Sequence, residues 1–283
     1  MNIDAHCHAW QRWPYSSVEP EPEIADVDRL LAEFDRSGVG HGLLIAAQIG
    51  GESPRTDNGA NNGYAAAAVR RHPGRLSMCA DVDSFWSDDH HTDGARHRLD
   101  RIIAETGAVG FTHYSTGRYD GWFDEPAGIA MFERAADLGL IASLHTPPDW
   151  QPAIGRLAQK LPTLPILIHH QGHVVVGPEP NSDLHRLLDN AVYPNIRVKV
   201  SGFYYLTGDN FPYPAARTQL VRIHREYGAG RLLWGSDWPV ASQFLNYPQT
   251  VELVAEHCPF LDDRDRKLIM GDNLAVLLGL DTA

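Results

Sequence analysis

The sequence is poor in cysteine and has no long apolar run. Its three cysteines, Cys7, Cys79 and Cys258, follow neither a CxxC spacing nor a disulfide framework. This spacing predicts reduced thiols and a cytoplasmic location. No apolar stretch approaches the ~20 residues of a membrane span. The chain also does not open with the charged and apolar regions of a signal peptide, so neither a membrane anchor nor export is expected.

Basic residues are also scarce, with 24 Lys and Arg against 36 Asp and Glu and a net charge of −12. Nucleic acids and anionic membranes attract basic patches, so neither is an expected partner. The chain has no GxGxxG or Walker-type loop after an apolar segment, which argues against an open, doubly wound nucleotide-binding sheet. A small molecule, cyclic or aromatic, is the expected partner, and a homodimer is a possible assembly.

What the chain does contain is a regular alternation of short apolar segments and amphipathic ones. The apolar segments are short and bounded by Gly, Pro or polar residues, as buried parallel strands are: 2–8, 41–47, 75–82, 108–114, 140–146, 165–170, 196–202 and 231–237. Helical patterns lie between or after them: 26–38, 61–74, 125–139, 214–228 and 263–280. The alternation predicts a single (β/α)₈ TIM-barrel domain over residues 1–283, with extended loops such as 10–23 and 171–183 at its C-terminal face.

Two histidines stand one residue apart in "IDAHCHAW", residues 3–10. Strand side chains alternate, so His6 and His8 are expected on one face, with Ile3, Ala5 and Cys7 on the other. Two imidazoles on one face can bind a metal ion, or they can be hydrogen-bonded histidines that fill a polar gap.

Other polar side chains stand at the ends of later strand segments. His145 ends 140–146, Asp237 ends 231–237, and His169 and His170 end 165–170. In a barrel these ends converge on one rim. Imidazoles with a carboxylate and no thiolate suit a catalytic zinc ion. Alternation predicts that only one of His169 and His170 reaches the site, and His173 can also reach the mouth.

Two other polar clusters have simpler explanations. "DDHH" at 88–91 is interpreted as a solvated surface turn, although its composition resembles a metal cluster. Asp262 and Asp263 precede a helical pattern and are interpreted as an N-terminal cap.

The strand-end motifs together resemble a known superfamily. "IDAHCHAW", "SLHT", "LIHHQGH", "VKVSGF" and "LLWGSDWP" resemble the amidohydrolase superfamily, from residue 3 to about residue 280. Within it they are similar to the amidohydrolase-2 branch of sugar lactonases, pyrone-dicarboxylate lactonase and decarboxylases. The resemblance implies one divalent metal ion, zinc with manganese as the alternative, held by His6, His8, His145 and Asp237.

The resemblance also implies roles around that ion. Asp237 is expected to shuttle a proton, and His170 to act as a second catalytic group. Expected substrate contacts are Trp10, His113, Lys199, Ser201 and Trp238. "GFTHYS" has Thr112 and His113 where lactonase members often carry GxRH, which weakens the case for an acidic substrate. The same segment has no lysine that carbamylation could turn into a bridge between two metals.

Three functions therefore stay open. The first is opening of a lactone or similar cyclic ester by a metal-activated water, with Asp237 as the proton shuttle. The second is metal-dependent, non-oxidative decarboxylation of an aromatic or unsaturated acid. The third is a catalytically inactive barrel that binds a small molecule.

Overall fold

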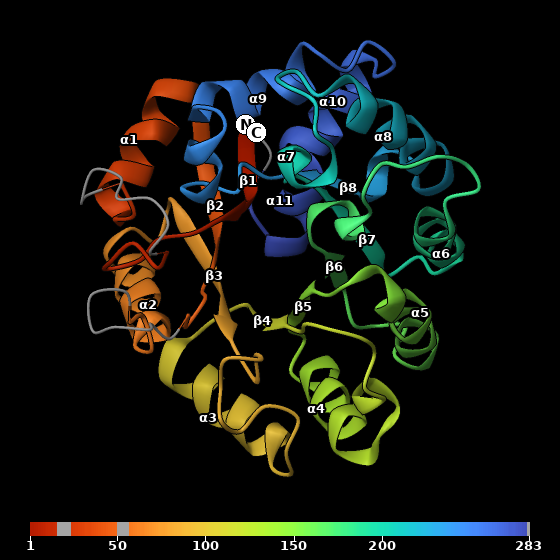
Figure 1. Ribbon diagram of the computed structural model, residues 1–283. Helices are drawn as coiled ribbons and strands as arrows, with labels where there is room; N and C mark the ends of the chain where they lie inside the picture. The colour runs from red at the N-terminus through yellow and green to blue at the C-terminus, as the bar shows by residue number, and fades with distance from the viewer. Residues whose placement is uncertain (16–23, 50–56, 282–283) are drawn as a thin grey trace.

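The computed structural model describes residues 1–15, 24–49 and 57–281, so part of the loop 10–23 lies outside it. Its parallel strands hydrogen-bond in chain order (Figure 1). They are β1 Asn2–Cys7, β2 Val39–Ile45, β3 Leu76–Asp81, β4 Gly110–Tyr114, β5 Ile141–His145, β6 Ile166–Ile168, β7 Ile196–Val200 and β8 Leu232–Trp234. The sheet curls so that its two edges meet: Cys7 forms a parallel bridge with Trp238. The predicted (β/α)₈ barrel is confirmed, and the alternative of an open, doubly wound sheet is excluded.

Helices surround these strands (Figure 1). They are α1 Val27–Ser37, α2 Asn61–Arg71, α3 Ala95–Thr106, α4 Pro126–Asp137, α5 Gln151–Lys160, α6 Ser182–Asp189, α7 Phe203–Leu206, α8 Pro214–Tyr227, α9 Tyr247–Ala255, α10 Asp263–Lys267 and α11 Asn273–Leu278. The pattern at 263–280 is interrupted by a π-helical turn, Leu268–Asp272. The helical patterns of the sequence did not include α3, α5, α6, α7 and α9. In α5 and α9 the second residue is a proline, Pro152 and Pro248. Both prolines occupy the first helical turn, where no backbone N–H donor is needed.

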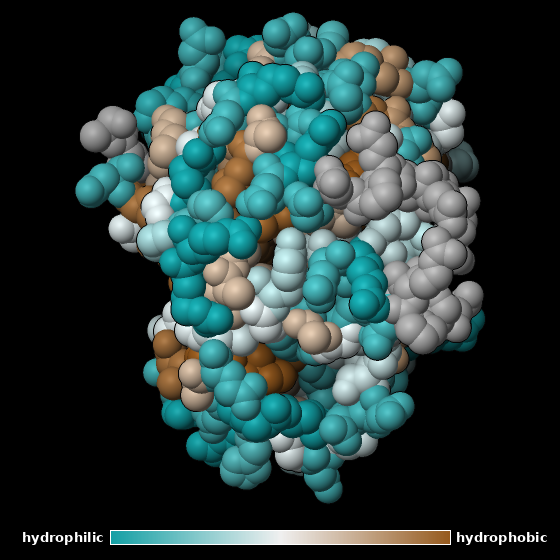
Figure 2. Space-filling model, turned by 90° about the vertical axis from the view of Figure 1, so that its left-hand side faces the viewer, coloured by the Kyte–Doolittle hydropathy of each residue, from teal (hydrophilic) through white to brown (hydrophobic). Residues whose placement is uncertain are grey.

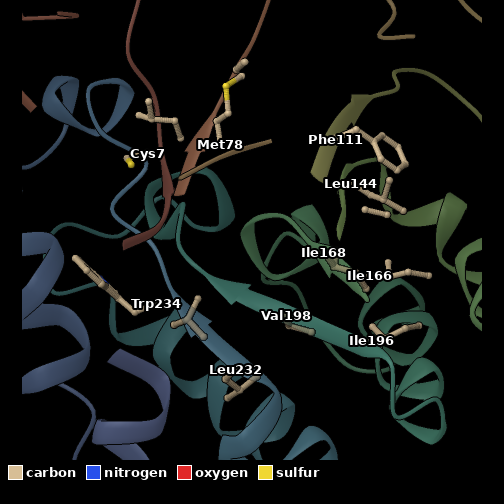
Figure 3. Packing of buried hydrophobic residues seen from close by; sticks show 14 of the residues in the cluster. Cys7, Met78, Phe111, Leu144, Ile166, Ile168, Ile196, Val198, Leu232 and Trp234 are labelled. Carbon is tan, nitrogen blue, oxygen red and sulfur yellow. The ribbon is translucent and has the colours of Figure 1, made fainter. Parts of the chain in front are cut away.

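The strands carry two separate apolar layers. Side chains such as Phe111, Ile168 and Val198 belong to the layer that packs against the helices, and Figure 3 shows members of it from β1 and from β3 to β8. A second buried set, which includes Leu43 and Leu167, fills the barrel interior. Fully burying one such side chain contributes about 1.5–3 kcal/mol. A barrel packed in this way leaves polar chemistry to its rim.

Strand β1 does not alternate regularly. Ile3 and Ala5 pack with the interior set, whereas Cys7 packs in the outer one. The carboxylate of Asp4 reaches Tyr247 in α9, outside the barrel. The pairing of β1 with β2 shifts register between Asp4 and Cys7. The prediction that Ile3, Ala5 and Cys7 share one face is therefore wrong, because a local irregularity of the bulge type resets the alternation.

The surface that carries α1 and α2 is mostly hydrophilic. Figure 2 shows that side of the barrel, with hydrophobic residues in small, separate patches. In the described part of the chain, no helix has the length and apolarity that crossing a membrane would require.

Asp4 joins the two edges of the barrel by hydrogen bonds to the backbone on both sides. Its Oδ1 accepts hydrogen bonds from the backbone N–H groups of His6 (3.0 Å) and Ser236 (2.9 Å), and its Oδ2 accepts one from the Tyr247 hydroxyl at 2.8 Å. Asp4 is fully buried, so its loss leaves buried donors without a partner.

We expect Asp4→Ala to lower the free energy of unfolding by on the order of 3 kcal/mol. Urea unfolding followed by circular dichroism measures this change. Asp35→Ala is the control, because Asp35 pairs with Arg75 at the surface, where such a pair contributes less than about 1 kcal/mol. Equal effects of the two substitutions would contradict the role given to Asp4.

Candidate active site

Three side chains at or just beyond the carboxyl ends of β1 and β8 converge at the rim. The Nε2 atoms of His6 and His8 lie 3.2 Å apart, and Asp237 Oδ1 lies 3.4 Å from the first and 3.3 Å from the second. All three side chains are buried. Ligands about 2.0–2.1 Å from a tetrahedral zinc ion are separated from each other by about 3.3 Å. The spacing of these atoms and the chemistry of the donors therefore fit a metal ion of the zinc class.

The ring of His8 is oriented by a hydrogen bond to the backbone of β2. Its Nδ1 lies 2.7 Å from the carbonyl oxygen of Ile45, which can only accept a hydrogen bond. The proton therefore sits on Nδ1 and leaves the Nε2 lone pair free, as in metal-binding imidazoles. Trp10 stacks on this ring at 4.7 Å between centroids, and its indole N–H donates to the Ala47 carbonyl. Trp10 therefore restrains the orientation of the His8 ring.

Lys199 lies beside His6. Its Nζ is 3.1 Å from His6 Nδ1 and 2.8 Å from Ser143 Oγ, and the residue has no exposed surface. Burial lowers the pKa of Lys199 to about 8, so the neutral amine is accessible near neutral pH. The neutral amine can accept a hydrogen bond from His6 Nδ1. In the described part of the chain, the hydrogen-bonding neighbours of the Lys199 amine are therefore His6 and Ser143, two side chains of the barrel itself.

His169 and His170 both point into the site. The Nε2 atom of His169 lies 2.7 Å from Ser143 Oγ inside the barrel. Ring nitrogens of His6, His169 and His170 lie within 4.8 Å of one another. The prediction that only one of the pair reaches the site is wrong.

Backbone conformation explains why His170 turns inward. Strand β6 ends at Ile168, and both His170 (φ 45°) and Gln171 (φ 52°) adopt left-handed backbone. This turn cancels the alternation that would send His170 outward. Ser201 Oγ then lies 3.0 Å from His170 Nδ1, and His170 Nε2 lies 3.9 Å from Asp237 Oδ2.

His145 lies next to the converging atoms but is not part of the group in which His6, His8 and Asp237 all lie within 4.8 Å of one another. Its ring centroid is 4.1 Å from that of His173 and 4.8 Å from that of Tyr114. Burial lowers the pKa of His145 to about 4, which keeps the ring neutral. Three of the four residues expected as ligands therefore converge, with the fourth beside them.

His113 and Trp238 are the remaining two residues expected to contact the substrate. His113 is on the outer side of β4, with Nδ1 3.1 Å from the Val82 carbonyl oxygen, and the structure does not bring it to this site. Its neighbour Tyr114 is the residue that faces the interior. Trp238 follows Asp237 and is buried, and its ring centroid lies 5.8 Å from that of Tyr247.

Two residues near the site were not assigned a role from the sequence. The Tyr204 hydroxyl donates to Asp237 Oδ2 at 2.5 Å. Asp81, at the end of β3, accepts hydrogen bonds from the Gln48 backbone N–H, the Ser84 hydroxyl and the Trp86 indole. Tyr204 stands in an aromatic run, 203–205, but no pattern in the sequence indicates which of these rings meets Asp237. Asp81 ends a strand segment, a signal that could have identified it.

A parallel barrel with polar side chains gathered at the carboxyl ends of its strands has the architecture of a barrel enzyme. The chain matches the Amidohydro_2 family, described as amidohydrolase, over residues 3–280, and it belongs to this family. The match confirms the resemblance found in the strand-end motifs.

Two curated relatives align over nearly the whole chain. L-fucono-1,5-lactonase of Burkholderia ambifaria is 26% identical, over 99% of this chain and 96% of its own length. 4-Sulfomuconolactone hydrolase of Rhizobium radiobacter is 25% identical, over 98% of this chain and 89% of its own length.

Solved structures share the fold. A probable 2-pyrone-4,6-dicarboxylic acid hydrolase of Acinetobacter baumannii, with citric acid bound, has 22% identity and a TM-score of 0.76 (99% of both chains). A zinc-bound amidohydrolase of Burkholderia multivorans has 17% identity and a TM-score of 0.77 (99% of this chain, 100% of that one). A 2,6-dihydroxybenzoate decarboxylase from Rhizobium has 18% identity and a TM-score of 0.65 (98% of both).

The burial of Asp81 makes the stability of the folded protein depend on pH. Burial raises its pKa from 3.8 to about 7, so between these values the folded protein binds a proton that the unfolded chain has lost. The contribution of Asp81 to stability is thus fully present below about pH 4 and is lost as the pH rises to about 7.

We expect the free energy of unfolding of the natural protein, minus that of Asp81→Asn, to fall by up to a few kcal/mol between pH 4 and pH 8. Urea unfolding of both proteins in chelator across this range measures the difference. Asp93→Asn, at an exposed position, should show no such trend. A difference that stays constant or rises with pH would contradict the assignment.

Proposed function

We propose that this protein hydrolyses a lactone, or a similar cyclic ester, at a single divalent metal ion on the barrel rim. The observation that carries the proposal is the 3.2–3.4 Å spacing of the two Nε2 atoms and the carboxylate oxygen. Two relatives named for lactone hydrolysis, aligned over at least 98% of this chain, support the reaction class.

His6, His8 and Asp237 would hold the ion, and His145 remains the proposed fourth ligand. The zinc-bound structure with the same fold supports zinc, with manganese as the alternative. When bound there, such an ion lowers the pKa of a water to about 7 and polarises a carbonyl. Lys199 and the Ile45 carbonyl oxygen keep the two imidazoles in place.

Asp237 is the proposed proton shuttle. Its Oδ1 belongs to the ligand group, whereas Oδ2 accepts the Tyr204 hydroxyl and lies 3.9 Å from His170 Nε2. Oδ2 can therefore take a proton from the attacking water and return it to the leaving oxygen. His170, held by Ser201, is the proposed donor to the charge that develops on the substrate oxygen.

The polar atoms around His145 support a hydroxylated substrate. In the described part of the chain, the Tyr114 hydroxyl, His145 Nδ1 and His173 Nε2 are buried without a hydrogen-bond partner. The rings of Tyr114 and His173 both contact the ring of His145. Buried polar groups normally have partners, and a lactone with several hydroxyl groups supplies them.

Decarboxylation of an aromatic or unsaturated acid is the second candidate. The decarboxylase structure with the same fold supports it, and so does the set of rings at the rim. In that reaction an acid, His170 or Asp237, would protonate the carbon that loses CO₂. The third candidate, an inactive binding barrel, predicts turnover of neither kind of substrate.

A substrate panel separates the three candidates. We expect the zinc-loaded protein to release acid from at least one of L-fucono-1,5-lactone, 4-sulfomuconolactone and 2-pyrone-4,6-dicarboxylate, and to release no CO₂ from 2,6-dihydroxybenzoate. A pH-indicator assay and a CO₂ assay follow the two products. CO₂ release without lactone opening would favour the decarboxylase, and product formation in neither assay would favour the inactive barrel.

Asp237→Asn tests the proton shuttle. It should reduce kcat by about 10²–10⁴-fold, because the amide cannot accept the proton, and it should leave the fold intact. Tyr204→Phe is the matched variant: it removes the hydrogen bond to Oδ2 but keeps the carboxylate, so its loss should be much smaller. Steady-state kinetics and circular dichroism measure both. Full activity in Asp237→Asn would disprove the assignment.

A further inference from the structure

A second group of histidines lies outside the barrel interior. His90 and His91 stand in the segment between β3 and α3, and His113 stands on the outer side of β4. One ring nitrogen from each lies within 4.8 Å of the other two. The interpretation of "DDHH" as a solvated turn is wrong for His91, whose side chain is 9% exposed and stacks on Trp122 at 4.3 Å between centroids.

Two of these rings have a defined proton position. Nδ1 of His113 lies 3.1 Å from the Val82 carbonyl oxygen, and Nδ1 of His90 lies 2.6 Å from the Asp83 carbonyl oxygen. Carbonyl oxygens only accept hydrogen bonds, so each Nδ1 carries the proton and each Nε2 presents a lone pair.

The third ring completes the pattern. Nδ1 of His91 contacts the carboxylate of Asp120, also an acceptor, and its Nε2 lies 3.1 Å from Nε2 of His113. An Nδ1–H bonded to a carbonyl or carboxylate, with Nε2 free, is the usual state of a metal-binding imidazole. Two neutral Nε2 lone pairs at 3.1 Å repel each other unless a proton or a cation lies between them.

The Nδ1 atoms of His91 and His113 each face an acceptor and so hold their proton on that side of the ring. A cation at the two Nε2 atoms satisfies both lone pairs without protonating either ring.

We propose that His90, His91 and His113 form a second metal site, separate from the candidate active site, for a divalent transition ion of the zinc class. Three imidazoles favour zinc, nickel or copper over magnesium or calcium. His90 is partly exposed, which gives an ion a path from solvent. The bound ion would tie the segment after β3 to β4 and stabilise this side of the barrel. The proposal does not depend on the proposed lactonase function.

The test counts zinc ions in the full-length protein. Apoprotein prepared with a chelator is loaded with zinc and desalted, and bound zinc is measured by elemental analysis. His91→Gln and, separately, the partly exposed His90→Gln remove one ligand each. His97→Gln is the matched control, because His97 is an exposed histidine on the neighbouring helix α3. Circular dichroism verifies that each variant folds.

We expect two zinc ions per chain in the natural protein and in His97→Gln, and one in His91→Gln. Zinc should also raise the melting temperature of a His6→Gln/His8→Gln variant, and adding His91→Gln should abolish that rise. If only the active-site proposal fails, the natural protein binds one ion, and His91→Gln removes it. Zinc content and melting temperature that do not change in folded His91→Gln and His90→Gln would overturn the second site.

Discussion

The candidate active site depends on the contact that closes the barrel. The backbone N–H of Asp237 donates to the carbonyl oxygen of His6 at 2.7 Å, and this bond joins the end of β8 to β1. Asp237 then turns through left-handed backbone (φ 57°), and its carboxylate comes to the Nε2 atoms of His6 and His8. Residues more than 200 positions apart in sequence therefore meet because the first and last strands are neighbours.

Buried polar groups hold this arrangement from beneath. Lys199 donates to Ser143 and contacts His6, Ser201 contacts His170, and Asp4 accepts backbone donors from both barrel edges. Each group is buried, where a hydrogen bond is stronger and a lost partner is costlier than in water. The rim is thus set by a connected polar layer above the apolar interior, which suits a site whose ligands must not move.

The sequence predicted the parts of this structure that follow from periodicity. Short apolar segments identified the eight strands, and the rule that parallel strands end at one rim brought His6, His8 and Asp237 together. The sequence failed to predict the face on which a side chain lies where one backbone angle or one register shift decides it, as at Ala5 and His170. It also failed for His91, because burial under Trp122 is a tertiary contact without a local signal.

We propose that His6, His8 and Asp237 bind one divalent ion at the barrel rim. A crystal structure of the zinc-loaded protein, with anomalous data collected on both sides of the zinc absorption edge, tests this binding. We expect an anomalous peak about 2.0–2.2 Å from both Nε2 atoms and from Asp237 Oδ1. No peak among these atoms at saturating zinc, or a peak that Asp237 does not contact, would contradict it.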